Sequence, residues 1–291
     1  MSEFDSPSGS WQPPEPVAPQ PSGPLQEAPA PRRQRPLPED VLTPWGWREL
    51  LLFIAVSLVS LILLTNLMAF GTILWLKIKP GDIDKFVMTN ATFLSLRTAI
   101  WYAAMIGYLF TTIRVNRNLP FWRTIGWHDW RSKTVPRPAL YALCAVGGMV
   151  LAVVVELGSI AFRTKAKLPI EALFQNRVGV MWLMAVGILL APAVEETIFR
   201  GYLYPVLART LGVEGGILAT GLLFGLMHAP QLWGGWGQIG LLVLVGIVLT
   251  YARARTGTVL TSWLLHLGYN TFLFAGFFIS TGGLRHLPPV S

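Results

Sequence analysis

Residues 49–76 read ELLLFIAVSLVSLILLTNLMAFGTILWL, and no charged residue follows Glu49 in this stretch. A membrane-spanning α-helix needs about 20 consecutive, predominantly apolar residues to cross the hydrocarbon core of a bilayer. The stretch exceeds that length. It therefore predicts a transmembrane helix, and with it a chain that is integral to a membrane.

Six further apolar runs follow along the chain, at residues 91–113, 139–162, 178–194, 215–229, 232–252 and 259–279. The run at 215–229 is short and broken by glycines, as expected of a helix that is buried among others. Residues 201–211 can form an additional interfacial or re-entrant helix. We therefore predict an all-α fold, a polytopic bundle of seven, or at most eight, transmembrane helices.

Composition agrees with this class of protein. The 291 residues are 53% hydrophobic and only 13% charged, whereas a soluble domain averages about 25% charged residues. The net charge of +8 is explained by Lys and Arg in cytoplasmic loops, so we expect no nucleic-acid partner. With seven spans and the N-terminus inside, 14 basic residues fall on the cytoplasmic side and 8 on the outer side. This bias predicts a plasma (cytoplasmic) membrane protein with a cytoplasmic N-terminus.

The chain divides by composition into four parts. Residues 1–45 hold 12 of the 22 prolines, and such a segment buries too little apolar surface to fold, so we predict a disordered, Pro-rich cytoplasmic tail. Residues 46–175 hold the N-terminal transmembrane helices and their loops. Residues 176–280 hold the helices that carry polar motifs, and residues 281–291 form a C-terminal tail. The single cysteine, Cys144, lies in an apolar run and is interpreted as a packing residue.

The string APAVEETIFRGY at residues 191–202 places ionisable side chains in an apolar region, where they are costly and therefore candidates for function. On a helix, Glu196 and Arg200 are four residues apart and can form an ion pair. Glu195 points about 100° away from Glu196 and is free to face another partner. Pro192 is expected to kink or restart the helix, which would place both acids near a helix N-terminus. The alternative is that both acids are interfacial charges.

Two further motifs carry imidazole groups. Phe224 and His228 lie in GLLFGLMHAP, at the end of a Gly-rich helix that Pro230 is expected to terminate. His266 and Asn270 lie in WLLHLGYN, four residues apart on one face of an apolar helix. Each motif alone has an ordinary structural explanation: a histidine with satisfied hydrogen bonds in the core, or polar groups that bond neighbouring helices.

Together these residues form a plausible hydrolytic site. Glu195 can take a proton from water as a general base, and one imidazole can position that water or relay its proton. His266 and Asn270 can donate hydrogen bonds to a developing oxyanion. A second inference concerns Arg97 and Glu156, which lie at similar depth in two spans and are predicted to pair, because unpaired charges in a membrane are costly.

At these residues the sequence resembles the CPBP family, which contains the type II CAAX prenyl endopeptidases and the bacteriocin-processing or self-immunity proteins. The family motifs read here as Glu195-Glu196-x-x-x-Arg200, Phe224-x-x-x-His228 and His266-x-x-x-Asn270. The resemblance spans residues 178–274 and implies that residues 176–280 form CPBP-type catalytic helices.

The resemblance implies a glutamate-dependent intramembrane endopeptidase. Glu195 and His228 would activate water, while His266 and Asn270 would form the oxyanion site. Glu196 and Arg200 would support them, with Phe224 completing its motif. We expect no cofactor and no metal; if the site held a metal, its ligands would be Glu195, His228 and His266.

The expected partners are membrane lipid and a peptide or protein substrate in or near the membrane, including prenylated CAAX-type substrates. The sequence does not determine the oligomeric state or the substrate. A protein of another class stays open: a non-catalytic self-immunity or membrane interaction protein that keeps the protease fold. A proton-relay transporter is disfavoured, because the segments show no inverted repeat of broken helices.

Overall fold

The structure, a computed structural model, describes residues 37–130, 135–161 and 169–287. Every regular element in these ranges is a helix, which confirms the predicted all-α fold. The α-helices are α1 (Trp47–Leu76), α2 (Ile83–Thr89), α3 (Ala91–Phe110), α4 (Phe121–Thr124), α5 (Arg137–Ala161), α6 (Arg177–Ala185), α7 (Ala191–Glu196), α8 (Tyr204–Met227), α9 (Trp236–Thr256) and α10 (Val259–Ser280). The shorter elements are the 3-10 helices η1 (Glu39–Val41), η2 (Pro80–Asp82) and η4 (Pro169–Leu173), and the π-helical segments η3 (Thr111–Val115), η5 (Val186–Leu190) and η6 (Thr197–Leu203).

Five helical segments of the described residues are long and apolar enough to cross a membrane, so the predicted count of seven is not confirmed. Two differences explain the lower number. The segment α10 carries His266 and Asn270 in its middle, which lowers its hydropathy. In addition, two predicted spans fall in one helical run of 51 residues, Arg177–Met227.

That long run turns sharply at Gly212, whose φ of 76° and ψ of 166° are not helical. A straight helix would separate residues 208 and 216 by about 12 Å. Instead, a Cβ on Gly216 would lie 2.7 Å from the Cα of Ala208. The chain therefore bends back at Gly212, and residues 201–211 form the continuation of the preceding helix.

The structure corrects the prediction for Pro192. The helical run continues through this residue, so the two acids follow it in the middle of a long helix and not near a free helix N-terminus. Proline lacks an N–H and its ring collides with the carbonyl four residues earlier in a regular α-helix. The π-helical segment η5 ends at Leu190, just before the proline, and its wider turn accommodates the ring.

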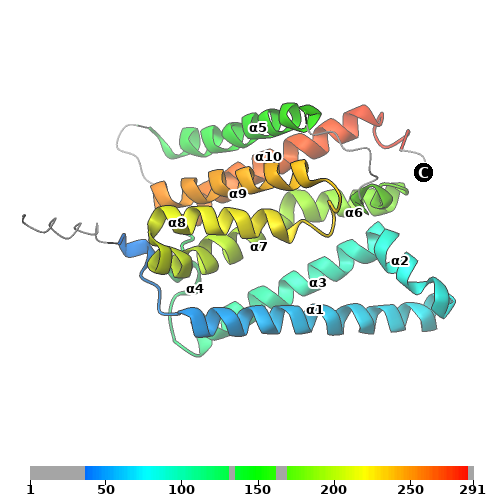
Figure 1. The fold of residues 1–291 in the computed structure, drawn as a ribbon, viewed down its shortest axis with the longest axis horizontal. Helices are drawn as coiled ribbons and strands as arrows, with labels where there is room; N and C mark the ends of the chain where they lie inside the picture. Colours follow the sequence, from blue (N-terminus) through cyan, green and yellow to red (C-terminus); the bar gives the residue numbers. More distant parts are fainter. Residues whose placement is uncertain (1–36, 131–134, 162–168, 288–291) are drawn as a thin grey trace, which may run out of the picture. The chain divides into compact units, whose positions relative to one another are not determined.

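Glycines allow the closest helix contacts. Figure 1 shows α5 lying along α10, and their backbones nearly touch, because a Cβ on Gly148 would lie 1.9 Å from the carbonyl oxygen of Leu265. A Cβ on Gly268 would lie 2.0 Å from the carbonyl oxygen of Ala145. Small residues at such crossings let membrane helices approach closely and gain packing contacts, because no hydrophobic effect drives helices together within lipid.

Residues 37–45 are ordered, which differs from the prediction for this part of the chain. Residues 1–36 lie outside the described residues, but residues 37–45, which the sequence analysis assigns to a disordered tail, pack against the helices. Val41 is fully buried, and the Trp45 ring stacks on Tyr202 at a centroid distance of 4.9 Å. Asp40 accepts a hydrogen bond of 2.5 Å from Arg253. The few apolar side chains of this segment suffice to order it because a helical surface is available to cover them.

The predicted pair between Arg97 and Glu156 is wrong. No salt bridge joins these residues in the described part of the chain. The helix α5 packs against α10 and α9, whereas α3, which carries Arg97, packs against α1 and α6. Similar depth in a membrane did not make the two helices neighbours.

We expect Gly148→Ala and Gly268→Ala to destabilise the protein by about 1–3 kcal/mol each, the usual cost of overpacking. A methyl group at either position collides with backbone, which cannot move aside as a side chain can. Thermal unfolding of the purified protein in detergent measures the change in stability. The control is Gly71→Ala on α1, where no atom lies within 4 Å of the added Cβ. An equal effect at all three positions would contradict the proposed backbone contact.

Candidate active site

Glu196 and Arg200 form a completely buried ion pair. Both side chains have an exposed fraction of 0%, and Arg200 Nη1 lies 2.7 Å from Glu196 Oε1. The remaining donors of the guanidinium bond α9: Nε donates to Thr250 Oγ1 at 3.1 Å and Nη2 to the carbonyl of Gly246 at 2.9 Å. The ion pair predicted from the four-residue spacing is confirmed, and its arginine is tied to a second helix.

His266 joins the same carboxylate from α10. Its Nδ1 lies 2.9 Å from Glu196 Oε1, the oxygen that also accepts from Arg200. Because a carboxylate in an ion pair only accepts, Nδ1 must carry the hydrogen in this contact. The imidazole is thereby oriented, and its Nε2 is the atom left for another interaction.

Phe224 lies at the centre of the cluster. Its ring is 5.0 Å from the ring of His228 and 5.7 Å from the ring of His266, and the guanidinium carbon of Arg200 lies 4.5 Å from its centroid. This is a cation–π contact in a buried environment. The aromatic residue of the second motif thus brings both imidazoles and the Glu196–Arg200 pair into one cluster.

His228 ends α8 and faces a cavity. It follows Met227, the last residue of the helix, as the position of Pro230 predicts. Its Nδ1 lies 2.8 Å from the carbonyl oxygen of Phe224. Since a carbonyl only accepts, Nδ1 is the donor, and in the neutral imidazole Nε2 carries the free lone pair. That is the form in which a histidine can take a proton.

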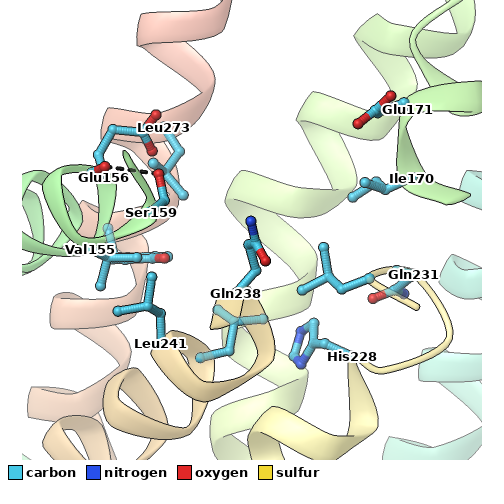
Figure 2. A pocket seen from close by; sticks show the side chains of 13 residues that line it. Val155, Glu156, Ser159, Ile170, Glu171, His228, Gln231, Gln238, Leu241 and Leu273 are labelled. Carbon is cyan, nitrogen blue, oxygen red and sulfur yellow. Dashed lines mark hydrogen bonds between the residues drawn. The ribbon is translucent and has the colours of Figure 1, made fainter. Parts of the chain in front are cut away.

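The cavity has a volume of about 460 Å³ and is lined by α5, η4, α9, α10 and the loop after α8. Figure 2 shows His228, Glu156 and Glu171 around it, each from a different element. Most of its remaining wall is apolar, with Leu241 and Leu273 among the lining side chains. Of the four predicted catalytic residues, His228 alone is among the described residues that line it. No sequence motif marks the two glutamates of this wall, Glu156 and Glu171, as site residues.

Glu195 points toward α3. Its Oε1 accepts a hydrogen bond of 2.6 Å from the hydroxyl of Tyr102, and its exposed fraction is 7%, against 0% for Glu196. The sequence predicted that the two neighbouring acids face different partners, which the structure confirms. It did not predict Tyr102, because the contact joins residues 93 positions apart and follows no local spacing.

Asn270 lies one turn after His266 on α10. Its Nδ2 donates to the carbonyl oxygen of Gly187 at 2.7 Å, inside the π-helical segment η5. A π-turn interrupts the regular α-helical bonding and leaves a carbonyl available for such a contact. One N–H of the amide is used in this way, and the second N–H remains for another acceptor.

The alternative metal site has no support in the geometry. Among the described residues, no three His, Cys, Asp or Glu side chains lie close enough together to hold a metal ion. The set of Glu195, His228 and His266 is therefore not assembled as metal ligands. Glu195 bonds Tyr102 through Oε1, and His266 bonds Glu196 through Nδ1.

Comparison with known proteins finds one family that the C-terminal helices resemble. Residues 177–272, about a third of the chain, match the family described as type II CAAX prenyl endopeptidase Rce1-like. The matched segment contains all three motifs and runs from the start of α6 into α10. This segment is thus similar to the CAAX-type intramembrane protease family that the motifs predict, and the match supports the resemblance. No curated protein and no solved structure shows a significant match to the chain.

We expect Arg200→Met to destabilise the protein by about 3–5 kcal/mol, because it leaves the buried Glu196 carboxylate without its main counter-charge. Unfolding in mixed micelles measures the change. The control Arg137→Ala breaks an ion pair whose side chains are about half exposed, and a pair of that kind contributes about 1 kcal/mol or less.

A second variant separates charge from packing. The double substitution Glu196→Leu with Arg200→Met removes both charges, and we expect it to be less destabilising than Arg200→Met alone. If Arg200→Met alone destabilised the protein as little as Arg137→Ala does, the buried pair would not constrain the fold.

Proposed function

We propose that the protein is an intramembrane endopeptidase that hydrolyses peptide bonds of membrane-associated substrates with a water activated by Glu195 and His228. The observation that carries this proposal is the Phe224-centred cluster, in which two imidazoles and a buried acid–arginine pair meet beside a cavity. The match of residues 177–272 to a protease family supports the reaction class.

The environments of the two acids support a division of roles. Glu196 is fully buried, and one of its oxygens already accepts from both Arg200 and His266. Glu195 keeps a small exposed fraction and bonds through Oε1 to a neutral hydroxyl. A general base must reach water and be able to take up a proton. Glu195 meets this requirement better, while Glu196 orients His266.

Glu195, assisted by Nε2 of His228, takes a proton from water as the water oxygen bonds to the carbonyl carbon of the scissile peptide. The carbonyl oxygen becomes an oxyanion, which donors on His266 and Asn270 stabilise. The C–N bond breaks, and the proton taken from water passes to the leaving nitrogen. For this step His266 would carry a hydrogen on Nε2 as well as on Nδ1, the nitrogen that faces the Glu196 carboxylate.

The cavity beside His228 supports a membrane-associated peptide as substrate. Its volume is within the usual range of roughly 300–1,000 Å³ for ligand pockets, and most of its wall is apolar. A prenylated CAAX-type protein is the substrate class that the family description names. The chain is an integral membrane protein, and we place it in the plasma membrane with its N-terminus in the cytoplasm.

The test uses the full-length protein in liposomes, mixed with a farnesylated CAAX peptide and, separately, with a total membrane protein extract. We expect new peptide termini, mapped by mass spectrometry, with the wild type. We expect none with Glu195→Gln and a large loss with His228→Ala, since removal of a general base typically costs about 10²–10⁴-fold in rate.

Two matched controls make the same chemical changes elsewhere. Glu214→Gln alters an exposed acid on α8, and His128→Ala alters a loop histidine; both variants should cleave like the wild type. If Glu195→Gln folds normally and cleaves at the wild-type rate, Glu195 is not the base. If the folded wild type produces no new termini, the non-catalytic immunity or interaction protein becomes the better explanation.

A further inference from the structure

The contact between Tyr102 and Glu195 comes from outside the segment that matches the protease family. Tyr102 lies on α3, and the matched residues begin at Arg177. We propose that Tyr102 is a positioning residue that holds Glu195 in the orientation needed for proton transfer. This inference rests on the proposed function.

The geometry fixes the direction of the hydrogen bond. An ionised carboxylate can only accept, so the Tyr102 hydroxyl donates to Glu195 Oε1. The separation of 2.6 Å lies in the range of charge-assisted O–H···O⁻ bonds, about 2.5–2.7 Å. Tyr102 and Glu195 are each only 7% exposed. A bond of this kind in a buried place is among the stronger hydrogen bonds that a neutral side chain can make.

The bond leaves the second oxygen of Glu195 for chemistry. Among the described residues, no hydrogen bond to Oε2 accompanies the bond to Oε1. A glutamate side chain has three rotatable bonds, and a fixed Oε1 restricts all of them. Tyr102 therefore aims the free oxygen, and it does so without a charge that would compete for the proton.

The helix that carries Tyr102 is itself locked to the helical run that carries Glu195. Asn90 caps α3 by accepting from the backbone N–H of Phe93 at 2.9 Å. At the same end, a Cβ on Gly179 of α6 would lie 2.9 Å from the Cβ of Ala91. The run from α6 continues through η5 into α7. Two contacts therefore fix the position of Tyr102 relative to Glu195. One is the close approach of Gly179 to Ala91, and the other, further along the helices, is the hydroxyl–carboxylate bond itself.

The alternative is that Tyr102 is only a core residue whose hydroxyl satisfies a buried acid. The two roles predict different kinetics. Loss of a packing or folding contribution changes the amount of active protein, whereas loss of positioning lowers the rate of the chemical step in protein that is folded and binds substrate. Tyr102→Phe keeps the ring and removes only the donor, so it separates the two.

The experiment compares Tyr102→Phe with the wild type in full-length protein reconstituted in liposomes, using the farnesylated CAAX peptide and the membrane extract. We expect kcat to fall about tenfold to a hundredfold, the effect of misplacing a reacting group by about 1 Å, with KM changed less than about twofold. The control is Tyr108→Phe, on the same helix, whose hydroxyl makes no hydrogen bond among the described residues. It should retain wild-type kcat.

A second measurement does not depend on activity. A double-mutant cycle of Tyr102→Phe and Glu195→Gln, followed by thermal unfolding in detergent, should be non-additive if the two side chains interact. Simple additivity overturns the contact. Non-additivity with unchanged kcat in active Tyr102→Phe overturns the positioning role and leaves the proposed function intact. A folded wild type that cleaves neither substrate overturns the proposed function, and the role of Tyr102 in it.

Discussion

The buried carboxylate of Glu196 is the constraint on which the arrangement of the C-terminal helices depends. A charge with no exposed surface is tolerated only if partners replace its hydration, because an unpaired ion in a low-dielectric interior is very costly. The partners come from its own helical run and from α10: Arg200 and His266. Arg200 in turn requires acceptors on α9. One acid therefore ties three segments of the chain together, and each of them carries or contacts a motif residue.

The same constraint separates the two neighbouring acids. Consecutive residues on a helix point about 100° apart, so once Glu196 faces α10, Glu195 is turned toward α3. Its environment is less buried and holds a neutral donor instead of a cation. Two carboxylates of identical chemistry thus lie in different surroundings, the condition under which two acids can take different roles. Glu196 is held by two basic partners, whereas Glu195 bonds a neutral hydroxyl through one oxygen, which is why it is the acid proposed to react.

Local spacing predicted what depends on a single helix. The ion pair of Glu196 and Arg200, the end of α8 at His228 and the divergence of the two acids all follow from 3.6-residue periodicity or from proline. Contacts between helices were not predictable in this way. The His266–Glu196 bond and the Tyr102–Glu195 bond depend on which helices pack together, and the sequence of one chain does not encode this as a spacing. The Arg97–Glu156 pair, which was predicted wrongly, shows the same limit. The turn at Gly212 is a second example, because a glycine in an apolar run can indicate either a bend or a close helix contact.

The polar side chains of α10 also fix the register of this helix against the helical run that carries Glu195 and Glu196. His266 reaches Glu196 in α7, and Asn270 reaches the carbonyl of Gly187 in η5. The later residue of α10 thus contacts the earlier residue of the other run, as expected for two antiparallel helices. Two such points fix both the axial position and the rotation of α10. The residues proposed to stabilise the oxyanion are therefore the residues that hold the helix in place, and removing either side chain disturbs register and chemistry at once. For this reason the proposed base, Glu195, and its proposed positioning residue, Tyr102, are better probes of mechanism. Each can lose one functional group while the shape of its side chain is kept.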